Sequence, residues 1–263
     1  MSLTNCFKNY YTIDVEKQLA CWPTMAVHVR RISSIRSIAE KLNPIQAHYL
    51  DEPCIHVTEK DEPIGSVSKK DCHRNPILHR AFSVFIFDPE RRLLLQKRSL
   101  DKITFPGVWT NACCSHPLHN RSEMDMPSHS GENLDFAIGI RRAAKRKLDH
   151  ELGISNIDLA QFHVMGRFIY KAVSDNDWME HELDYALVVP NFDCKNISPN
   201  SEEVSDVKLV DQSTLESMMQ DSKTHKFSPW FNLFANFDWL KLWWNNLHDL
   251  EKLKDLTAIH RLN

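Results

Sequence analysis

The sequence predicts an α+β fold, in which a mixed or antiparallel sheet is flanked by helices. Segments with the apolar patterns of strands interleave along the chain with segments of helical periodicity. Several of the expected strands are joined by short turns, as in hairpins. The composition, with 42% hydrophobic and 25% charged residues, is that of an ordinary globular domain with a full core.

The first half of the chain is expected to supply a buried strand of the sheet. Residues 81–87 form a near-continuous apolar run of β-branched and aromatic side chains, which is typical of a buried strand. A turn over 88–91 then predicts that residues 92–97 pair back as a hairpin. Upstream, the alternating segment 54–58 is expected to be a strand, and 59–65 a turn.

The second half of the chain is expected to add helices and a long hairpin. Residues 134–152 carry an apolar stripe at three- and four-residue spacing, and Gly153 ends this helix. The predicted strands span 162–173, 178–189 and 204–210, with a turn over 174–177 and a polar exposed loop over 119–133. Further helices are expected around 215–219 and as one element over 229–250, where Ser228 caps and Pro229 occupies the first turn.

Charge and cysteine usage exclude several classes of protein. The formal net charge of the 263 residues is -3, which does not indicate nucleic-acid binding. The apolar runs are too short to span a membrane. The seven cysteines include no Cys-X-X-Cys pair, so we expect free thiols in a reducing compartment.

Residues 1–52 are expected to be a flexible or targeting extension, and residues 53–263 the folded domain. Met25–Ile38 contains three arginines, three serines and no acid, a composition that suits a transit peptide. The preceding 24 residues include Asp14 and Glu16, so targeting requires Met25 as an alternative start or a tolerated prefix. We therefore expect a cytoplasmic monomer, with the mitochondrion as the alternative location.

The segment Thr110–Pro117, which reads TNACCSHP, places a thiol and an imidazole two residues apart. In an extended chain Cys114 and His116 face one side, while Cys113 and Ser115 are turned away. An imidazole is a common metal ligand and a thiol can exchange a proton. Alone, a Cys-X-His segment is typical of a buried cysteine beside an ordinary histidine, so the interpretation depends on further residues.

Other segments supply these residues. Glu180 and Glu182 are spaced to share one face of a strand, and with His73, His79 and His116 they make a nitrogen and oxygen donor set for zinc, manganese or iron(II). Four basic residues suit a phosphate: Lys69, Arg98, Lys102 and Lys147. Glu151 at the end of the predicted helix is placed to hold Mg²⁺ against that phosphate. Tyr170 and Trp230 are candidates for a proton relay and an aromatic wall.

At these residues the sequence resembles the type I isopentenyl-diphosphate isomerases, a branch of the Nudix fold. The specific signatures are TNACCSHP and the segment WMEHELDY, and the similarity runs from about residue 57 to 244. The Nudix helix is degenerate, because the family core REXXEE reads Arg-Lys-Leu-Asp-His-Glu here and keeps only its last acid, Glu151. That loss argues against ordinary Nudix pyrophosphohydrolysis, which needs several carboxylates to hold its metals.

The resemblance implies conversion of isopentenyl diphosphate to dimethylallyl diphosphate in isoprenoid biosynthesis, with Cys114 and Glu182 as acid and base and Tyr170 close by. It implies one divalent ion, Zn²⁺ or Mn²⁺, on the histidines with Glu180 and Glu182, and a Mg²⁺ bridging Glu151 to the diphosphate. The four basic residues named above would bind the diphosphate, and Trp230 the hydrocarbon. Which of Cys114 and Glu182 protonates first is left open.

Two rival hypotheses remain at this stage. One is a Nudix hydrolase of a diphosphate compound, which the fold and Glu151 favour and the missing acids oppose. The other is a metal-stabilised module without enzymatic activity, in which the histidines and glutamates only stabilise the fold. Under each of the three hypotheses we expect no nucleic-acid or membrane partner.

Overall fold

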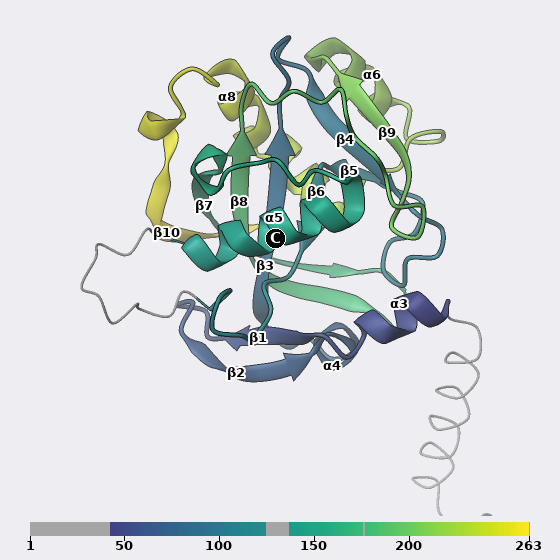
Figure 1. Cartoon of the computed structure of the whole chain (residues 1–263), viewed down its shortest axis with the longest axis vertical. Helices are drawn as coiled ribbons and strands as arrows, with labels where there is room; N and C mark the ends of the chain where they lie inside the picture. Colours follow the sequence, from purple (N-terminus) through teal and green to yellow (C-terminus); the bar gives the residue numbers. More distant parts are fainter. Residues whose placement is uncertain (1–42, 125–136, 176, 263) are drawn as a thin grey trace, which may run out of the picture. The chain divides into compact units, whose positions relative to one another are not determined.

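The structure is a computed structural model that describes residues 43–124, 137–175 and 177–262 (Figure 1). The arginine-rich segment Met25–Ile38 and most of the predicted loop over 119–133 lie outside the described residues.

The described residues alternate between helices and strands throughout. In chain order the elements are α3 (Pro44–Tyr49), β1 (Pro53–Val57), β2 (Pro63–Ser68), α4 (Lys69–Arg74), β3 (His79–Ile86), β4 (Leu93–Arg98), β5 (Trp109–Asn111), β6 (Cys113–Ser115), α5 (Ile138–Leu152), η2 (Leu159–Gln161), β7 (His163–Val173), β8 (Met179–Val189), β9 (Val204–Val210), α6 (Gln212–Gln220), α7 (Pro229–Asn236), α8 (Trp239–Asn245), η3 (Leu250–Leu253) and β10 (Asp255–Leu262).

Within this part of the chain the strands form two sheets. The larger has the order β10-β7-β8-β3-β1-β2, and β6 also pairs with β3. It is mixed, since β3 runs parallel to β8 and antiparallel to β6 and β1. The smaller sheet has the order β5-β4-β9. The predicted α+β class with a mixed sheet flanked by helices is therefore confirmed.

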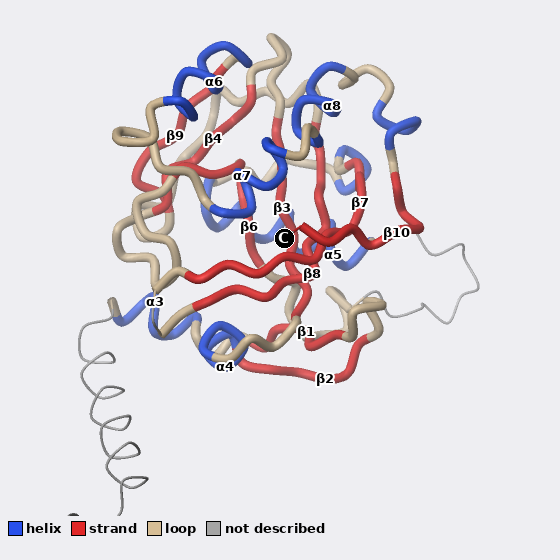
Figure 2. The backbone as a smooth tube through the Cα atoms, turned by 180° about the vertical axis from the view of Figure 1, so that it is seen from behind, coloured by secondary structure: helices blue, strands red, loops and turns tan. Residues whose placement is uncertain are grey.

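Helices cover both faces of the larger sheet. Alternate residues of β3 enter different cores, because successive side chains of a strand point to opposite faces. Phe82 packs with Ile140 of α5 on one face, whereas Phe85 packs with Phe234 of α7 and Trp243 of α8 on the other. Figure 1 shows α5 across the near face, and Figure 2 shows α7 on the opposite side.

Most strand predictions agree with the structure within one or two residues. The segments expected over 162–173 and 178–189 are the antiparallel pair β7 and β8, joined by the predicted turn. The helix expected over 134–152 begins at Ile138 as α5 and ends at Gly153, whose φ of 68° is left-handed as a C-cap glycine requires. Residues 134–136 lie outside the described residues.

The predicted hairpin of 81–87 with 92–97 is wrong. β3 and β4 lie in different sheets and are joined only by an isolated bridge between Phe87 and Leu93. The carboxylate of Asp88 accepts hydrogen bonds from the backbone and the guanidinium of Arg92, both at 2.7 Å. The predicted turn over 88–91 is therefore confirmed, but β4 pairs with β5 and β9 and not with β3.

The single helix predicted over 229–250 is also wrong. It is divided into α7, α8 and η3, and the break lies at Asp238, whose φ of 61° is left-handed. The break lets the aromatic residues of both helices pack on one face of the sheet. The sequence reading also missed α3, α4, β2 and β10. No helix of the described residues is long and apolar enough to cross a membrane.

Candidate active site

One face of the larger sheet carries the predicted site. His79 of β3 is the register partner of Glu182 in β8, and Glu182 is the partner of Tyr170 in β7. On the other side of β3, Ser83 pairs with Cys114 of β6. Residues at i and i+2 share a face, so the strands themselves bring these side chains together.

A cavity opens on this face, and its empty space, including the part open to solvent, is about 590 Å³. Most of the predicted site residues line this cavity, and residues at α3 line it too. The full lining consists of Gln46, Tyr49, Leu50, Lys69, His73, Arg98, Lys102, Ile103, Thr104, Cys114, Ser115, His116, Glu151, Trp178, Glu180, Glu182 and Trp230. Cys114 and His116 both line the cavity as predicted. Ser115, predicted to turn away, lines it as well, which corrects that expectation.

Three histidines and one glutamate form a cluster at this cavity, and all of them except His79 line it. One donor atom from each of His73, His79, His116 and Glu182 lies within 4.8 Å of the others. Oε1 of Glu182 is 2.9 Å from Nε2 of His116, 3.6 Å from that of His79 and 3.9 Å from that of His73. Burial lowers the pKa of His73, and its histidine neighbours lower it further. This convergent set of three imidazoles and one carboxylate fits a divalent metal ion.

Backbone carbonyls orient two of these rings. Nδ1 of His73 donates to the carbonyl of Lys69 at 2.9 Å, and Nδ1 of His79 donates to that of Ile77 at 2.8 Å. A donor at Nδ1 leaves the lone pair on Nε2, which is the usual way a protein prepares an imidazole ligand. Nε2 of His79 is buried and has no hydrogen-bond partner among the described residues. An unsatisfied nitrogen here supports a bound ion.

Glu180 stands outside this histidine group. The hydroxyl of Tyr170 lies 3.1 Å from Oε2 of Glu180 and 2.5 Å from Oε2 of Glu182. Burial, and then the charge of Glu182, raise the pKa of Glu180 to about 8. Burial also raises the pKa of Glu182, but the hydrogen bond from His116 and the nearby imidazole of His79 outweigh it and hold that pKa low. Glu180 and Glu182, which both contact the hydroxyl of Tyr170, thus have different pKa values.

The basic residues divide into two groups. Lys69, Arg98 and Lys102 line the cavity, whereas Lys147 does not. Nζ of Lys147 lies 3.2 Å from Oε1 of Glu151, one turn away on α5. Burial lowers the pKa of Lys147, but Glu151 and other acids raise it above the ordinary value. Lys147 is therefore placed as the partner of Glu151.

Glu151 and Gln96 offer oxygen donors beside the cavity. Oε2 of Glu151 accepts from Nε2 of Gln96 at 3.0 Å, and the buried amide oxygen of Gln96 has no hydrogen-bond partner in the described part of the chain. Oxygen donors of this kind suit Mg²⁺, which keeps waters and takes further oxygens from a substrate phosphate.

Asn111 fixes the aromatic wall of the cavity. Its Oδ1 accepts from Nε1 of Trp230 at 3.0 Å, and its Nδ2 donates to the carbonyl of Cys113 at 2.7 Å. The indole of Trp230 also packs edge-on against Phe105 and lies 5.6 Å from the guanidinium carbon of Arg98. One amide thus holds both Trp230 and the strand that carries Cys114.

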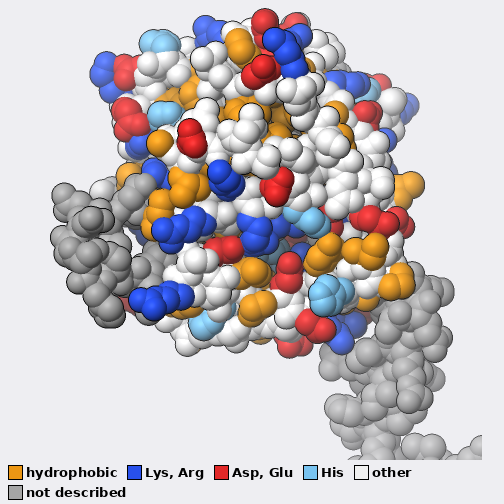
Figure 3. Space-filling view, viewed as in Figure 1, with side chains coloured by type: hydrophobic (Ala, Val, Ile, Leu, Met, Phe, Trp, Pro, Cys, Tyr) orange, Lys and Arg blue, Asp and Glu red, His pale blue; other side chains and the backbone are white. Residues whose placement is uncertain are grey.

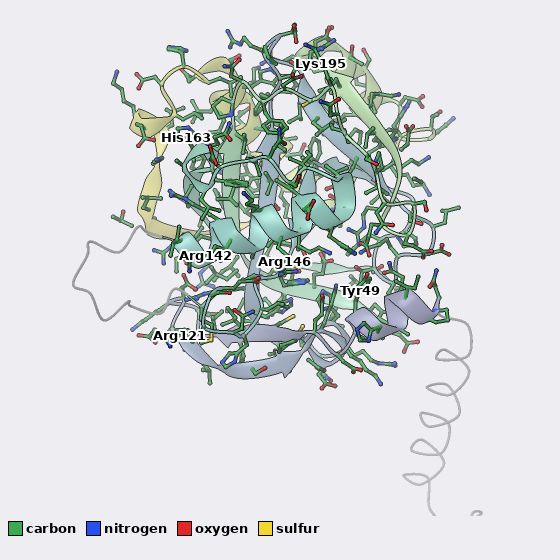
Figure 4. The ribbon with its side chains drawn as sticks, in the orientation of Figure 1. Tyr49, Arg121, Arg142, Arg146, His163 and Lys195 are labelled. Atoms are coloured by element: carbon green, nitrogen blue, oxygen red, sulfur yellow. The ribbon has the colours of Figure 1, made fainter. Side chains whose placement is uncertain are left out.

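The sequence patterns did not indicate several residues in or next to the cavity. Glu203, buried before β9, accepts from Nζ of Lys102 at 2.5 Å and from Nε2 of Gln46 at 2.9 Å. Tyr49 of α3 lies 2.9 Å from Nε2 of His150, and Figure 4 shows it beside α5. No local pattern marks Glu203 or Tyr49, because their partners lie more than one hundred residues away.

Behind the cavity, α5 anchors the loop that follows His116. Nη2 of Arg146 donates to the carbonyl of His116 at 3.2 Å, and its Nε donates to Glu123 at 2.7 Å. Figure 4 labels Arg146 on α5, and Figure 3 shows basic side chains across this face. The clamp fixes the backbone of a metal-ligand candidate.

Comparisons with known proteins agree with this geometry. The NUDIX domain family model matches residues 77–231. An isopentenyl-diphosphate delta-isomerase of Gibberella zeae is 44% identical over 227 residues, covering 82% of this chain and 85% of that protein. The chain belongs to the isopentenyl-diphosphate delta-isomerase family.

Other members of the isopentenyl-diphosphate delta-isomerase family come from animals and plants. Isopentenyl-diphosphate Delta-isomerase 1 of Mesocricetus auratus is 42% identical over 230 residues, covering 84% of this chain and 96% of that protein. A Cannabis sativa relative named as chloroplastic is 41% identical over 227 residues, covering 81% of this chain and 75% of that protein. The family, with its Nudix fold, is thus the one that the sequence motifs indicated.

Proposed function

We propose that this protein converts isopentenyl diphosphate to dimethylallyl diphosphate. The observation that carries the proposal is one cavity lined by Cys114, by His73, His116 and Glu182 of the histidine cluster, and by cationic side chains. Moving a double bond requires a proton to be added at one carbon and another to be removed from a neighbouring carbon. The cavity has groups for both steps and a binding region for a diphosphate.

The proton-exchanging groups are Glu182, Tyr170 and Cys114. Glu182, with the hydroxyl of Tyr170 at 2.5 Å, forms one side, and the thiol of Cys114 forms the other. One side gives a proton to the terminal methylene carbon, which leaves a tertiary carbocation. The opposite side takes a proton from the allylic carbon, and the new double bond neutralises the charge. Labelling experiments with isotopic hydrogen decide which of the two sides gives the first proton.

The carbocation needs an environment without water. Trp230 is 1% exposed and lies at the cavity wall. Its π face stabilises a nearby cation by roughly 0.5–2 kcal/mol, with the larger value where water is excluded. Burial raises the pKa of Cys114, so the thiol stays protonated until a substrate group changes its surroundings.

The diphosphate is assigned to Lys69, Arg98 and Lys102, which line the same cavity. Binding energy from this remote group orients the hydrocarbon against the proton-exchanging residues. Lys147 is also assigned to the diphosphate site, where it acts through its ion pair with Glu151. Its primary ammonium lacks the bidentate fork of an arginine.

Two divalent ions are assigned to the protein. His73, His79, His116 and Glu182 would hold Zn²⁺ or Mn²⁺, with Glu180 reaching the same group through Tyr170. Such an ion would fix Glu182 and tune its acidity. Glu151 would hold a Mg²⁺ that neutralises the diphosphate. The Mg²⁺ would support binding of the diphosphate, whereas the protein side chains carry out the proton transfers.

The chain is proposed to act as a cytoplasmic monomer on a small diphosphate, without nucleic-acid or membrane partners. Residues 53–263 form the proposed catalytic domain, and α3 within the 1–52 extension contributes Gln46 and Tyr49 to the cavity wall. The mitochondrion remains the alternative location through Met25–Ile38. A reporter fused to residues 1–52 that stays diffuse in the cell removes this alternative.

The decisive experiment is an isomerisation assay with isopentenyl diphosphate, Mg²⁺ and trace zinc or manganese. We expect an acid-labile allylic product from the wild type and none from Cys114→Ala or Glu182→Gln. Phosphate release from nucleoside diphosphates, measured in parallel, tests Nudix hydrolysis, which the single acid Glu151 disfavours. A well-folded, metal-loaded wild type without allylic product overturns the proposal.

A further inference from the structure

We infer that Ser83 and Asp184 are positioning residues that hold the thiol of Cys114 toward the cavity. The inference deepens the proposed function and rests on it, because it assigns a supporting pair to one of the two proton-exchanging groups. Neither residue lines the cavity, and we assign to each a role that acts through Cys114.

The three side chains form a row across three neighbouring strands. Oγ of Ser83 on β3 lies 2.7 Å from Oδ2 of Asp184 on β8 and 3.6 Å from Sγ of Cys114 on β6. Ser83 is the register partner of Cys114. Ala81, two residues before Ser83, is the partner of Asp184, so all three side chains share one face.

Ser83 and Asp184 lie in apolar surroundings, where burial of a polar group lowers the stability of the fold. Ser83 and Asp184 are both fully buried. The same face carries the apolar core that contains Phe85, Phe168 and Ala186. Packing alone would be served by apolar side chains, since a buried hydroxyl or carboxyl is unfavourable unless it is hydrogen-bonded. Apart from Asp184, the one side chain that Ser83 contacts by a hydrogen bond in the described structure is Cys114.

A cysteine needs such support if it is to exchange a proton at a defined carbon. Its side chain has one rotatable bond with three staggered positions. Small errors in the position of a reacting group reduce the rate strongly. The hydroxyl of Ser83 favours the rotamer that keeps Sγ at the cavity, and the bond to Asp184 keeps the hydroxyl from rotating away.

The test compares Ser83→Ala with the wild type in two measurements. Loss of one neutral hydrogen bond predicts a fall of kcat by about threefold to tenfold, while KM stays within about twofold. The crystal structure of the variant is expected to show Cys114 Sγ in a second rotamer. A merely structural role would lower stability and leave both the rotamer and kcat unchanged.

Variants of Asp184 keep the inference falsifiable if Ser83→Ala folds poorly. Asp184→Asn retains an oxygen acceptor and is expected to keep a single Cys114 rotamer and near-wild-type kcat. Asp184→Leu, of similar volume, is expected to behave like Ser83→Ala. The matched control is Tyr185→Phe, which removes a buried hydroxyl bonded to Asp61 on the opposite face. It should leave kcat unchanged.

The outcomes separate this inference from the proposed function. If the wild type lacks isomerase activity, the proposed function fails, and the rotamer of Cys114 still tests the positioning. If the wild type is active but Ser83→Ala and Asp184→Leu keep one Cys114 rotamer and full kcat, the positioning role is overturned while the function stands.

Discussion

Nε2 of His79 lies 3.6 Å from Oε1 of Glu182, and the two residues are register partners in the parallel pair β3 and β8. Neither side chain is more than 2% exposed. The ring nitrogen has no hydrogen-bond partner in the described residues. A buried polar atom in this state is costly unless a ligand satisfies it. We therefore expect a metal ion bound at this pair to contribute to stability.

Removal of metal is expected to destabilise the wild type and not the variant His79→Ala. An ion present at a thousandfold its dissociation constant stabilises the fold by roughly 4 kcal/mol, and a strong chelator removes that contribution. Calorimetric Tm values with and without chelator measure the effect. The control His248→Ala changes an exposed histidine and should respond to chelator like the wild type. An equal chelator response in His79→Ala contradicts the assignment.

Substrate binding is expected to weaken above about pH 8 because of Lys102. Burial lowers the pKa of this ammonium to about 8; the charge of Glu203 opposes the shift, and Arg98, Lys69 and Lys147 add to it. The group is charged below that pH and neutral above it. Loss of its charge-assisted bond to phosphate costs about 1.5–3 kcal/mol, which raises KM by roughly tenfold or more.

The pH profile of KM on either side of pH 8 measures this loss. Lys102→Arg keeps its charge at every accessible pH, so its KM should not rise there. Lys223→Arg, at an exposed site, is the control and should reproduce the wild-type profile. A wild-type KM that is flat through this range shows that Lys102 does not bind the diphosphate in its charged form.

Asn111→Ala is expected to lower both stability and kcat. The substitution leaves the indole N–H of Trp230 without the acceptor it has at 3.0 Å. A buried donor without its partner costs about 1–3 kcal/mol, and the wall next to the reacting carbons is no longer fixed. Urea denaturation and steady-state kinetics measure the two effects. Asn232→Ala, a half-buried position on α7, should shift stability by no more than about 0.5 kcal/mol and leave kcat intact.

The part of the site that follows strand periodicity could be predicted from the sequence. Glu180 and Glu182 share a face of β8, and Cys114 and His116 meet the same cavity, because the two-residue repeat of a strand fixes where side chains point. The approach of His73 and His79 to this cavity depends on α4 and β3 packing against β8. The structure brings these residues together in one region.

The part that depends on long-range packing could not be predicted. The ion pair of Lys102 with Glu203 joins residues 101 positions apart, and the acid gives no local signal within the segment Asn200–Val204. The break at Asp238 needs a left-handed backbone in a residue other than glycine, which periodicity does not indicate. The parallel pairing of β10 with β7 likewise joins segments whose local patterns predict no particular partner.

Asp61→Ala is expected to destabilise the fold without changing the chemistry. Asp61 has a left-handed φ of 69°, and its Oδ1 accepts from Nε of Arg80 at 2.6 Å. Its Oδ2 accepts from the hydroxyl of Tyr185 and from Arg167. Removing one partner of a buried ion pair costs about 3–5 kcal/mol, because a buried charge loses its counter-charge.

Chemical denaturation of Asp61→Ala measures the loss, and kcat is measured on the fraction that remains folded. The network lies outside the cavity lining, so that kcat should match the wild type. Asp51→Ala, at an exposed acid, is the comparison and should lie within about 0.5 kcal/mol of the wild type. If both variants unfold at the wild-type urea midpoint, the bond from Arg80 to Asp61 does not stabilise the link between the β1–β2 turn and the sheet.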